Sequence, residues 1–191
     1  MKKLLLLTLI TIVFISCSEK NPISDQIEQE INENAMGADL DYKPIETVKV
    51  DEVHYQDFLE IFKIQADIEG SEESIDTILV KVERGMESLK KQNKADTFNY
   101  MKFQKKRLQQ YKNANNKNDV AYTIYHHKYS IINPMFNDVK VEVNNYYFFD
   151  NKQKLMFSID DSEFKEIKND YIQHDKIAYE YMLFDGEYDF L

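Results

Sequence analysis

The chain of 191 residues contains one cysteine, no tryptophan, 4 glycines and 3 prolines. A single cysteine excludes an intramolecular disulfide, so a folded domain must be stabilised by its core alone. The scarcity of glycine and proline argues against collagen-like chains, and no internal repeat of about 20–50 residues is present. By contrast, 13 tyrosines and 12 phenylalanines are ample for a packed core.

The charge is strongly acidic, with a formal net charge of −10 at pH 7. Such a surface repels phosphate backbones and anionic lipid, so we expect no nucleic-acid binding and no electrostatic docking of the whole domain on a membrane. Motifs for common catalytic chemistry are missing as well. There is no Gly-x-Ser-x-Gly, no glycine-rich phosphate loop and no HExxH. The sequence therefore favours a domain without catalytic residues, metal or cofactor.

The first residues follow the three-part plan of a secretory signal. Lys2 and Lys3 precede an apolar run over residues 4–15, and the small residue Ser16 precedes Cys17. The run is 12 residues long, whereas a membrane-spanning helix needs about 20. We therefore predict a cleaved signal and not a transmembrane anchor.

Residues 14–17, Phe-Ile-Ser-Cys, resemble the lipobox of bacterial lipoproteins. Ser16 supplies the small residue expected before the cysteine, while Phe14 and Ile15 depart from the usual pattern. The resemblance implies that residues 1–16 are cleaved and that Cys17 carries the acyl chains that hold the protein on a membrane. Ser18 is not the aspartate typical of inner-membrane retention, which favours the outer membrane of the cell envelope. An ordinary cleaved signal followed by an unmodified cysteine is the alternative.

Residues 17–44 are polar and predict a lipidated tether before a single domain over residues 45–191. A coil of about 27 residues has an end-to-end distance of about 30 Å. Ile23, Ile27 and Ile31 are spaced four apart, which allows a short helix capped by Ser24. This narrow stripe is too small to form a stable helix by itself.

Two helices are expected in the first half of the domain, and a third segment is ambiguous. Residues 53–69 fit both a helical stripe and a strand alternation, and their length and the glycine at position 70 favour a helix. Residues 75–94 show the clearest helical spacing, with Ser74 as the cap. Asp96 is the expected cap of the next helix, whose basic stretch over residues 102–112 predicts a solvated face or a patch for an acidic partner.

The second half predicts a sheet. Residues 120–132 are rich in tyrosine and isoleucine, and residues 139–149 and 155–159 alternate, which predicts three antiparallel strands. A last strand is expected over residues 177–184. A short helix capped by Asp161 or Ser162 lies between them. The predicted fold is α+β, with N-terminal helices packed on one face of a three- to four-stranded antiparallel sheet. This order of elements resembles the cystatin-like and NTF2-like folds, from which we draw no function.

Several aromatic residues and one histidine pair are the candidate site residues. Tyr146 and Phe148 fall on the second face of their strand, which is either covered by another element or exposed as a binding patch. Asp150-Asn151-Lys152 and Asp185-Gly186-Glu187 are interpreted as turns between strands and not as calcium loops. His126 and His127 point to opposite faces of a strand, so both cannot bind one metal; we expect one in solvent and one among tyrosines.

Three functions compete. The first is a tethered lipoprotein that binds a protein partner in the envelope without catalysis. The second is a carrier with an apolar pocket lined by Tyr122, Tyr125, Tyr147 and Phe157. The third, a hydrolase or metal enzyme, needs a histidine grouped with two further ligands and is the least favoured.

Overall fold

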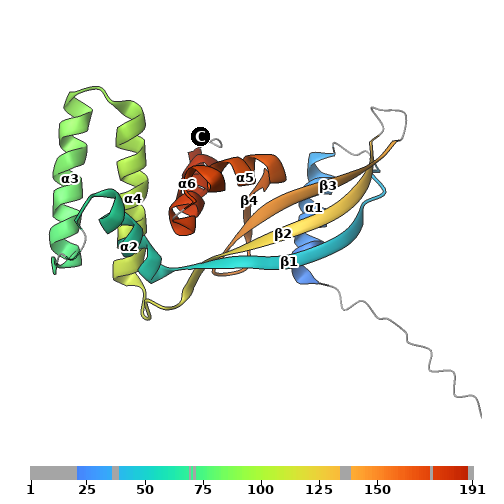
Figure 1. Cartoon of the computed structure of the whole chain (residues 1–191), viewed down its shortest axis with the longest axis horizontal. Helices are drawn as coiled ribbons and strands as arrows, with labels where there is room; N and C mark the ends of the chain where they lie inside the picture. Colours follow the sequence, from blue (N-terminus) through green and yellow to red (C-terminus); the bar gives the residue numbers. More distant parts are fainter. Residues whose placement is uncertain are drawn as a thin grey trace, which may run out of the picture.

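The structure is a computed structural model that describes residues 21–35, 39–68, 70, 72–133, 139–172 and 174–188. The expected signal peptide and Cys17 lie outside these residues. Within them the chain folds as α+β, with six helices and one open, four-stranded antiparallel sheet in the order β1-β2-β3-β4 (Figure 1). The α+β class and the antiparallel meander are thus confirmed.

The elements follow one another as α1 (Pro22–Asn34), β1 (Lys43–His54), α2 (Tyr55–Gln65), α3 (Ile75–Lys91), α4 (Ala95–Asn113), β2 (Val120–Asn133), β3 (Val139–Asp150), β4 (Leu155–Asp160), α5 (Asp161–Asp170) and α6 (Asp175–Tyr188).

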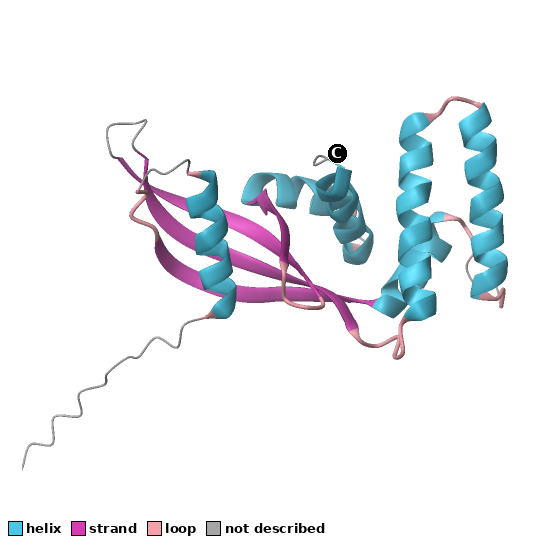
Figure 2. Cartoon of the chain, turned by 180° about the vertical axis from the view of Figure 1, so that it is seen from behind, coloured by secondary structure: helices cyan, strands magenta, loops and turns pink. Residues whose placement is uncertain are grey.

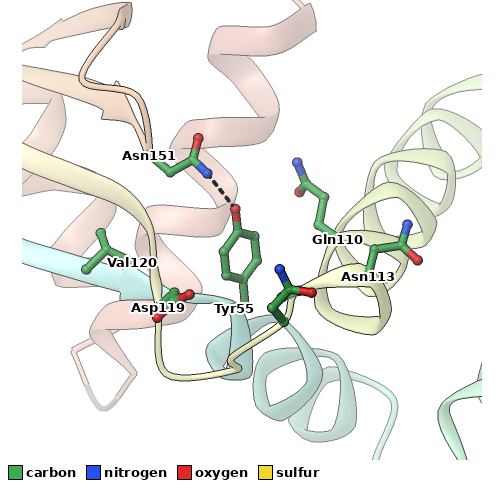
Figure 3. A pocket seen from close by; sticks show the side chains of 8 residues that line it. Tyr55, Gln110, Asn113, Asp119, Val120 and Asn151 are labelled. Atoms are coloured by element: carbon green, nitrogen blue, oxygen red, sulfur yellow. Dashed lines mark hydrogen bonds between the residues drawn. The ribbon is translucent and has the colours of Figure 1, made fainter.

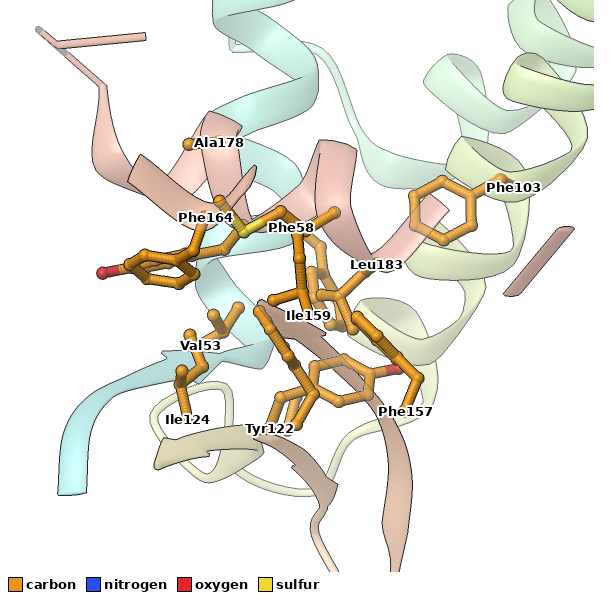
Figure 4. Close-up of a cluster of buried hydrophobic side chains, with 14 residues drawn as sticks. Val53, Phe58, Phe103, Tyr122, Ile124, Phe157, Ile159, Phe164, Ala178 and Leu183 are labelled. Atoms are coloured by element: carbon orange, nitrogen blue, oxygen red, sulfur yellow. The ribbon is translucent and has the colours of Figure 1, made fainter. Parts of the chain in front are cut away.

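Helices cover both faces of the sheet and not one face as predicted. Because side chains alternate along a strand, Ile124 and Phe148 face α5 and α6, whereas Tyr147 and Phe149 face α1. Figure 2 shows α1 on the side of the sheet opposite α5 and α6. The larger core lies under α5 and α6 and extends to Phe58 and other residues of α2 and α4 (Figure 4).

The helix α1 replaces much of the coil that was expected before the domain. Asn21, and not Ser24, caps it by accepting a hydrogen bond from the backbone N–H of Ile23 at 3.0 Å. Ile23 and Ile27 are buried against the sheet. The isoleucine stripe is stabilised by tyrosines and a phenylalanine that are distant in the sequence, which a local pattern cannot reveal.

The helices α3 and α4 form a hairpin at one end of the sheet, joined to it by α2 (Figure 1). Ser74 caps α3 by accepting from the Thr77 backbone N–H at 3.3 Å, as predicted. Helix α4 begins one residue before Asp96, and Lys94 at its cap makes no side-chain capping bond. The helix prediction for the ambiguous segment over residues 53–69 is confirmed by α2.

The predicted last strand is wrong, because residues 177–184 lie in helix α6. Most of its residues are apolar and many are buried, so the run carries no clear period. Gly186 is therefore helical and not part of a turn, whereas Asp150 does begin the turn between β3 and β4. Asp160 caps α5 one residue before the predicted positions, accepting from the N–H groups of Ser162 and Glu163.

Candidate functional site

The strand face that carries Tyr146 and Phe148 is covered by the chain itself. Phe148 is fully buried and stacks on Phe157 with ring centroids 4.5 Å apart. Tyr146 is half-buried and stacks on Phe164 of α5 at 3.5 Å. Coverage by another element, one of the two expected alternatives, is what the structure shows for this face. Phe148 is therefore a core residue and not a surface anchor.

The apolar pocket expected for a carrier does not form. Tyr122 and Phe157 belong to the core under α5 and α6. Tyr125 and Tyr147 pair with each other across β2 and β3 and pack on the α1 side. Residues on opposite faces of one sheet cannot line a single pocket, so these four side chains stabilise two cores.

His127 forms a buried polar network between β2, β1 and the segment after α1. Its Nε2 lies 2.7 Å from the Tyr42 hydroxyl, and its Nδ1 lies 2.7 Å from the Thr47 hydroxyl. Burial lowers the pKa of His127 to about 4, and neighbouring His126 acts in the same direction. The ring is therefore neutral near pH 7, so one nitrogen donates and the other accepts. His127 is thus the histidine packed among tyrosines, whereas His126 is partly buried, with its ring centroid 4.9 Å from that of Tyr146.

In the segments that the structure describes, no three His, Cys, Asp or Glu side chains are arranged to hold a metal ion. The grouping that a metal enzyme would need around His126 or His127 is not found there. His127 itself is fully buried, so a substrate has no route to its nitrogens. The network instead joins the sheet to the chain that leads from α1.

Arg107 and Glu180 form a second buried polar site, between α4 and α6. The Arg107 guanidinium lies 4.4 Å from the centroid of Phe103 and 4.7 Å from that of Tyr122. It also donates to the Tyr122 hydroxyl and, at 3.0 Å, to the Gln110 side-chain oxygen. Burial raises the pKa of Glu180 to about 7, and the charge of Arg107 opposes this change.

The basic stretch of α4 was expected to be solvated, and Arg107 is the exception. Elsewhere in the stretch, Lys105 pairs with Glu83 at 2.7 Å and Lys112 pairs with Asp76 at 2.6 Å. Both pairs join α4 to α3. Because these lysines are matched by acids of the neighbouring helix, a free positive patch for an acidic partner loses support.

A polar cleft lies where α2, the end of α4 and the β3–β4 turn meet. Its volume is about 580 Å³, and a smaller cavity of about 190 Å³ shares Tyr55, Gln110 and Asn151 with it. Asn151 donates to the Tyr55 hydroxyl at 2.9 Å, and Gln110 and Asn113 lie across the cleft from them (Figure 3). The lining residues of the larger cleft are Tyr55, Gln110, Asn113, Ala114, Asn115, Asp119, Val120 and Asn151. We call this site the carboxamide cleft.

The floor of the carboxamide cleft is an organised loop, residues 114–119. The Lys117 ammonium donates to backbone carbonyls at the end of α4, at 2.6 Å from the Ala114 oxygen and 3.1 Å from the Lys112 oxygen. The Lys117 carbonyl in turn accepts from the backbone N–H of Gln56 at 2.9 Å, at the start of α2. The loop thus satisfies the ends of two helices at once, and these hydrogen bonds hold the floor of the cleft in place.

The carboxamide cleft is lined mainly by groups that form hydrogen bonds. Each carboxamide offers one acceptor and two donor hydrogens, and the Tyr55 hydroxyl can do both. Asp119 is the one ionisable carboxylate among the residues lining the larger cleft. A neutral, polar partner group that accepts and donates hydrogen bonds fits it best.

No known protein family, no curated protein and no solved structure matches this chain. Across the described residues, none of the helices has the length and apolar character needed to cross a membrane. The carboxamide cleft was not predicted from the sequence, because its residues come from three separate regions. The only local signal is the asparagine-rich stretch 113–118, whose composition is typical of a loop.

Proposed function

We propose that this chain is a lipid-anchored protein of the bacterial cell envelope, held at the outer membrane, whose domain binds a protein partner without catalysis. We further propose that the partner docks in the carboxamide cleft. The observation that carries the proposal is the lining: asparagine and glutamine side chains around a tyrosine hydroxyl, in a cleft of about 580 Å³. A carboxamide has the same donor and acceptor groups as a peptide unit, so it can bind exposed main chain.

Charge supports a partner that approaches with neutral polar groups. The sequence carries 34 acidic and 24 basic residues, so a strongly acidic partner would be repelled. A small apolar ligand is disfavoured as well, because apolar ligands prefer pockets lined mainly by hydrophobic side chains.

Two matched variants test docking in the carboxamide cleft. Asn113→Arg places a long charged side chain at the cleft wall, while Gln109→Arg places the same side chain on the exposed surface of the same helix. We expect wild type and Gln109→Arg to recover the same stoichiometric protein from detergent-solubilised membranes, and Asn113→Arg to lose it. Equal recovery by both arginine variants would show that the partner binds elsewhere.

The lipid anchor is tested separately with Cys17→Ala. Cys17 follows the predicted cleavage point, so its thiol is the expected site of the acyl chains. We expect wild type in the membrane fraction and Cys17→Ala in the soluble fraction. If both proteins sediment with membranes and migrate identically, Cys17 is not the anchor.

A further inference from the structure

The position of helix α1 restricts how a lipid-anchored domain can stand on its membrane. Only residues 18–21 separate Cys17 from Pro22, the first residue of α1. An extended chain advances about 3.5 Å per residue, so the two Cα atoms lie at most about 18 Å apart. From Pro22 onward the described chain belongs to the folded domain. The domain is thus close to the lipid and not raised on a long tether.

Helix α1 is fixed to the rest of the domain. Ile23 and Ile27 are 4% and 0% exposed and pack on the tyrosine-rich face of the sheet. The Gln26 side-chain oxygen accepts from the backbone N–H of Leu155 at 3.4 Å. Because detaching α1 would expose this apolar surface, the start of α1 sets the orientation of the whole domain.

The surface next to the start of α1 is the β3–β4 turn. Gln26 lies in the second turn of α1, and its partner Leu155 directly follows residues 151–154. In Figures 1 and 2 the first turn of α1, the β3–β4 turn and the loop after α4 lie along the lower side of the molecule. The connection between α3 and α4 lies on the upper side. We call the surface formed by the first turn of α1, the β3–β4 turn and the loop after α4 the lower surface.

Within the lower surface, positive charge is concentrated in the β3–β4 turn, while Asp25 of α1 and Asp119 of the loop after α4 are acidic. Lys152 and Lys154 are exposed in the β3–β4 turn, where the Asp150 side chain accepts from both of their backbone N–H groups. Lysines close to a membrane are attracted to anionic headgroups, whereas acidic faces are repelled. The short connection to Cys17 therefore selects the lower surface, and the two lysines favour the β3–β4 turn as its part nearest to the headgroups.

We propose that the lower surface faces the lipid headgroups, with the β3–β4 turn directed at them. This inference rests on the proposed lipidation of Cys17. Asn151 of the same turn lines the carboxamide cleft, so the cleft lies on the membrane side of the domain. The partner must then present its segment at the membrane surface, as a membrane-bound envelope protein would.

The absence of tryptophan makes this orientation measurable, because one introduced tryptophan is the only one in the chain. Lys152→Trp places it in the β3–β4 turn, and Lys91→Trp places it at the end of α3, on the upper side (Figure 1). Each lipidated protein is reconstituted in phosphatidylcholine vesicles, with and without lipid that carries a nitroxide on the headgroup. We expect the fluorescence of Lys152→Trp to be lost with the nitroxide lipid and that of Lys91→Trp to be unchanged.

Other results overturn the orientation, and a mass measurement identifies the reason. Intact mass and vesicle flotation show first whether Cys17 is acylated. If the protein is acylated and floats, yet Lys152→Trp is not quenched or Lys91→Trp is quenched as strongly, the orientation is wrong while the anchor stands. If Cys17 carries no lipid, the anchor and the orientation fail together. Circular dichroism of both exposed variants against wild type confirms that they are folded.

Discussion

Two buried ionisable residues should give this protein opposing dependences of stability on pH. Burial raises the pKa of Glu180 from 4.5 to about 7, and burial lowers the pKa of His127 from 6.5 to about 4. Both side chains are nearly or fully inaccessible, at 3% and 0% exposed. One pKa unit corresponds to about 1.4 kcal/mol, so each residue changes the free energy of unfolding by about 3 kcal/mol across its window.

The two windows overlap and the two signs differ. The folded state holds the Glu180 proton more tightly than the unfolded state does, so its contribution is full below pH 4.5 and is lost as pH rises to about 7. The folded state disfavours the His127 proton, so its contribution is full above pH 6.5 and is lost as pH falls to about 4. In wild type, these two contributions largely cancel.

When one of the two residues is replaced, the pH dependence of stability that the remaining residue causes is no longer cancelled. For Glu180→Gln, the free energy of unfolding relative to wild type should rise by about 3 kcal/mol between about pH 4 and about pH 8. For His127→Gln, the free energy of unfolding relative to wild type should rise by about 3 kcal/mol as the pH falls over the same range. Urea unfolding followed by circular dichroism measures both, and differences from wild type remove the general effect of net charge.

The control for this experiment is Glu166→Gln, at an exposed glutamate of α5. This variant makes the same substitution on the surface of the protein. A Glu180→Gln difference that is constant to within about 0.5 kcal/mol over the same range would refute the reasoning. It would mean that the Glu180 carboxyl is well solvated or fully neutralised by Arg107.

Three further predictions concern a buried charge, the close contacts of two glycines, and the packing of α1. Arg107→Met should cost about 3–5 kcal/mol at pH values where Glu180 is ionised, and less in a Glu180→Gln background, because the loss leaves a buried charge without its cation. Gly186→Ala places a methyl group 2.7 Å from the Phe157 ring and should cost about 1–3 kcal/mol in thermal unfolding. Gly85→Ala meets only the end of the Met101 side chain, so stability should be unchanged or up to about 1 kcal/mol higher. Ile27→Ala should cost about 2–5 kcal/mol if α1 packs on the sheet, whereas Glu30→Ala on its exposed face should change stability by less than about 0.5 kcal/mol.

The sequence predicted the elements whose pattern is local and one-sided. Helix α3 has a single apolar stripe and a serine cap, and β3 and β4 alternate on either side of a short turn, so period and boundary agree. Helix α6 was missed because its run of apolar residues has no clear period, which makes helix and strand look alike. Helix α1 was underrated because the stability of its narrow stripe comes from Tyr129, Tyr147 and Phe149, all distant in sequence.

The carboxamide cleft and the buried charges could not be predicted, for a related reason. Arg107 lies in a basic stretch, and the local pattern predicts that it is solvated. Its burial depends on residues that the fold brings to it, among them Phe58 of α2 and Tyr122 of β2. The cleft likewise joins Tyr55, Gln110 and Asn151 from three elements. Each is an ordinary polar residue in its own segment, and only their convergence makes a site.

The central claim, that a protein partner docks in the carboxamide cleft, is tested most directly by photo-cross-linking in membranes. A benzophenone amino acid replaces Asn113 at the wall of the cleft or, as a control, exposed Glu87 on α3. We predict one discrete adduct of constant mass from position 113 and none from position 87. No adduct from position 113 in a protein that is folded and membrane-bound, or the same adducts from both positions, would contradict the claim.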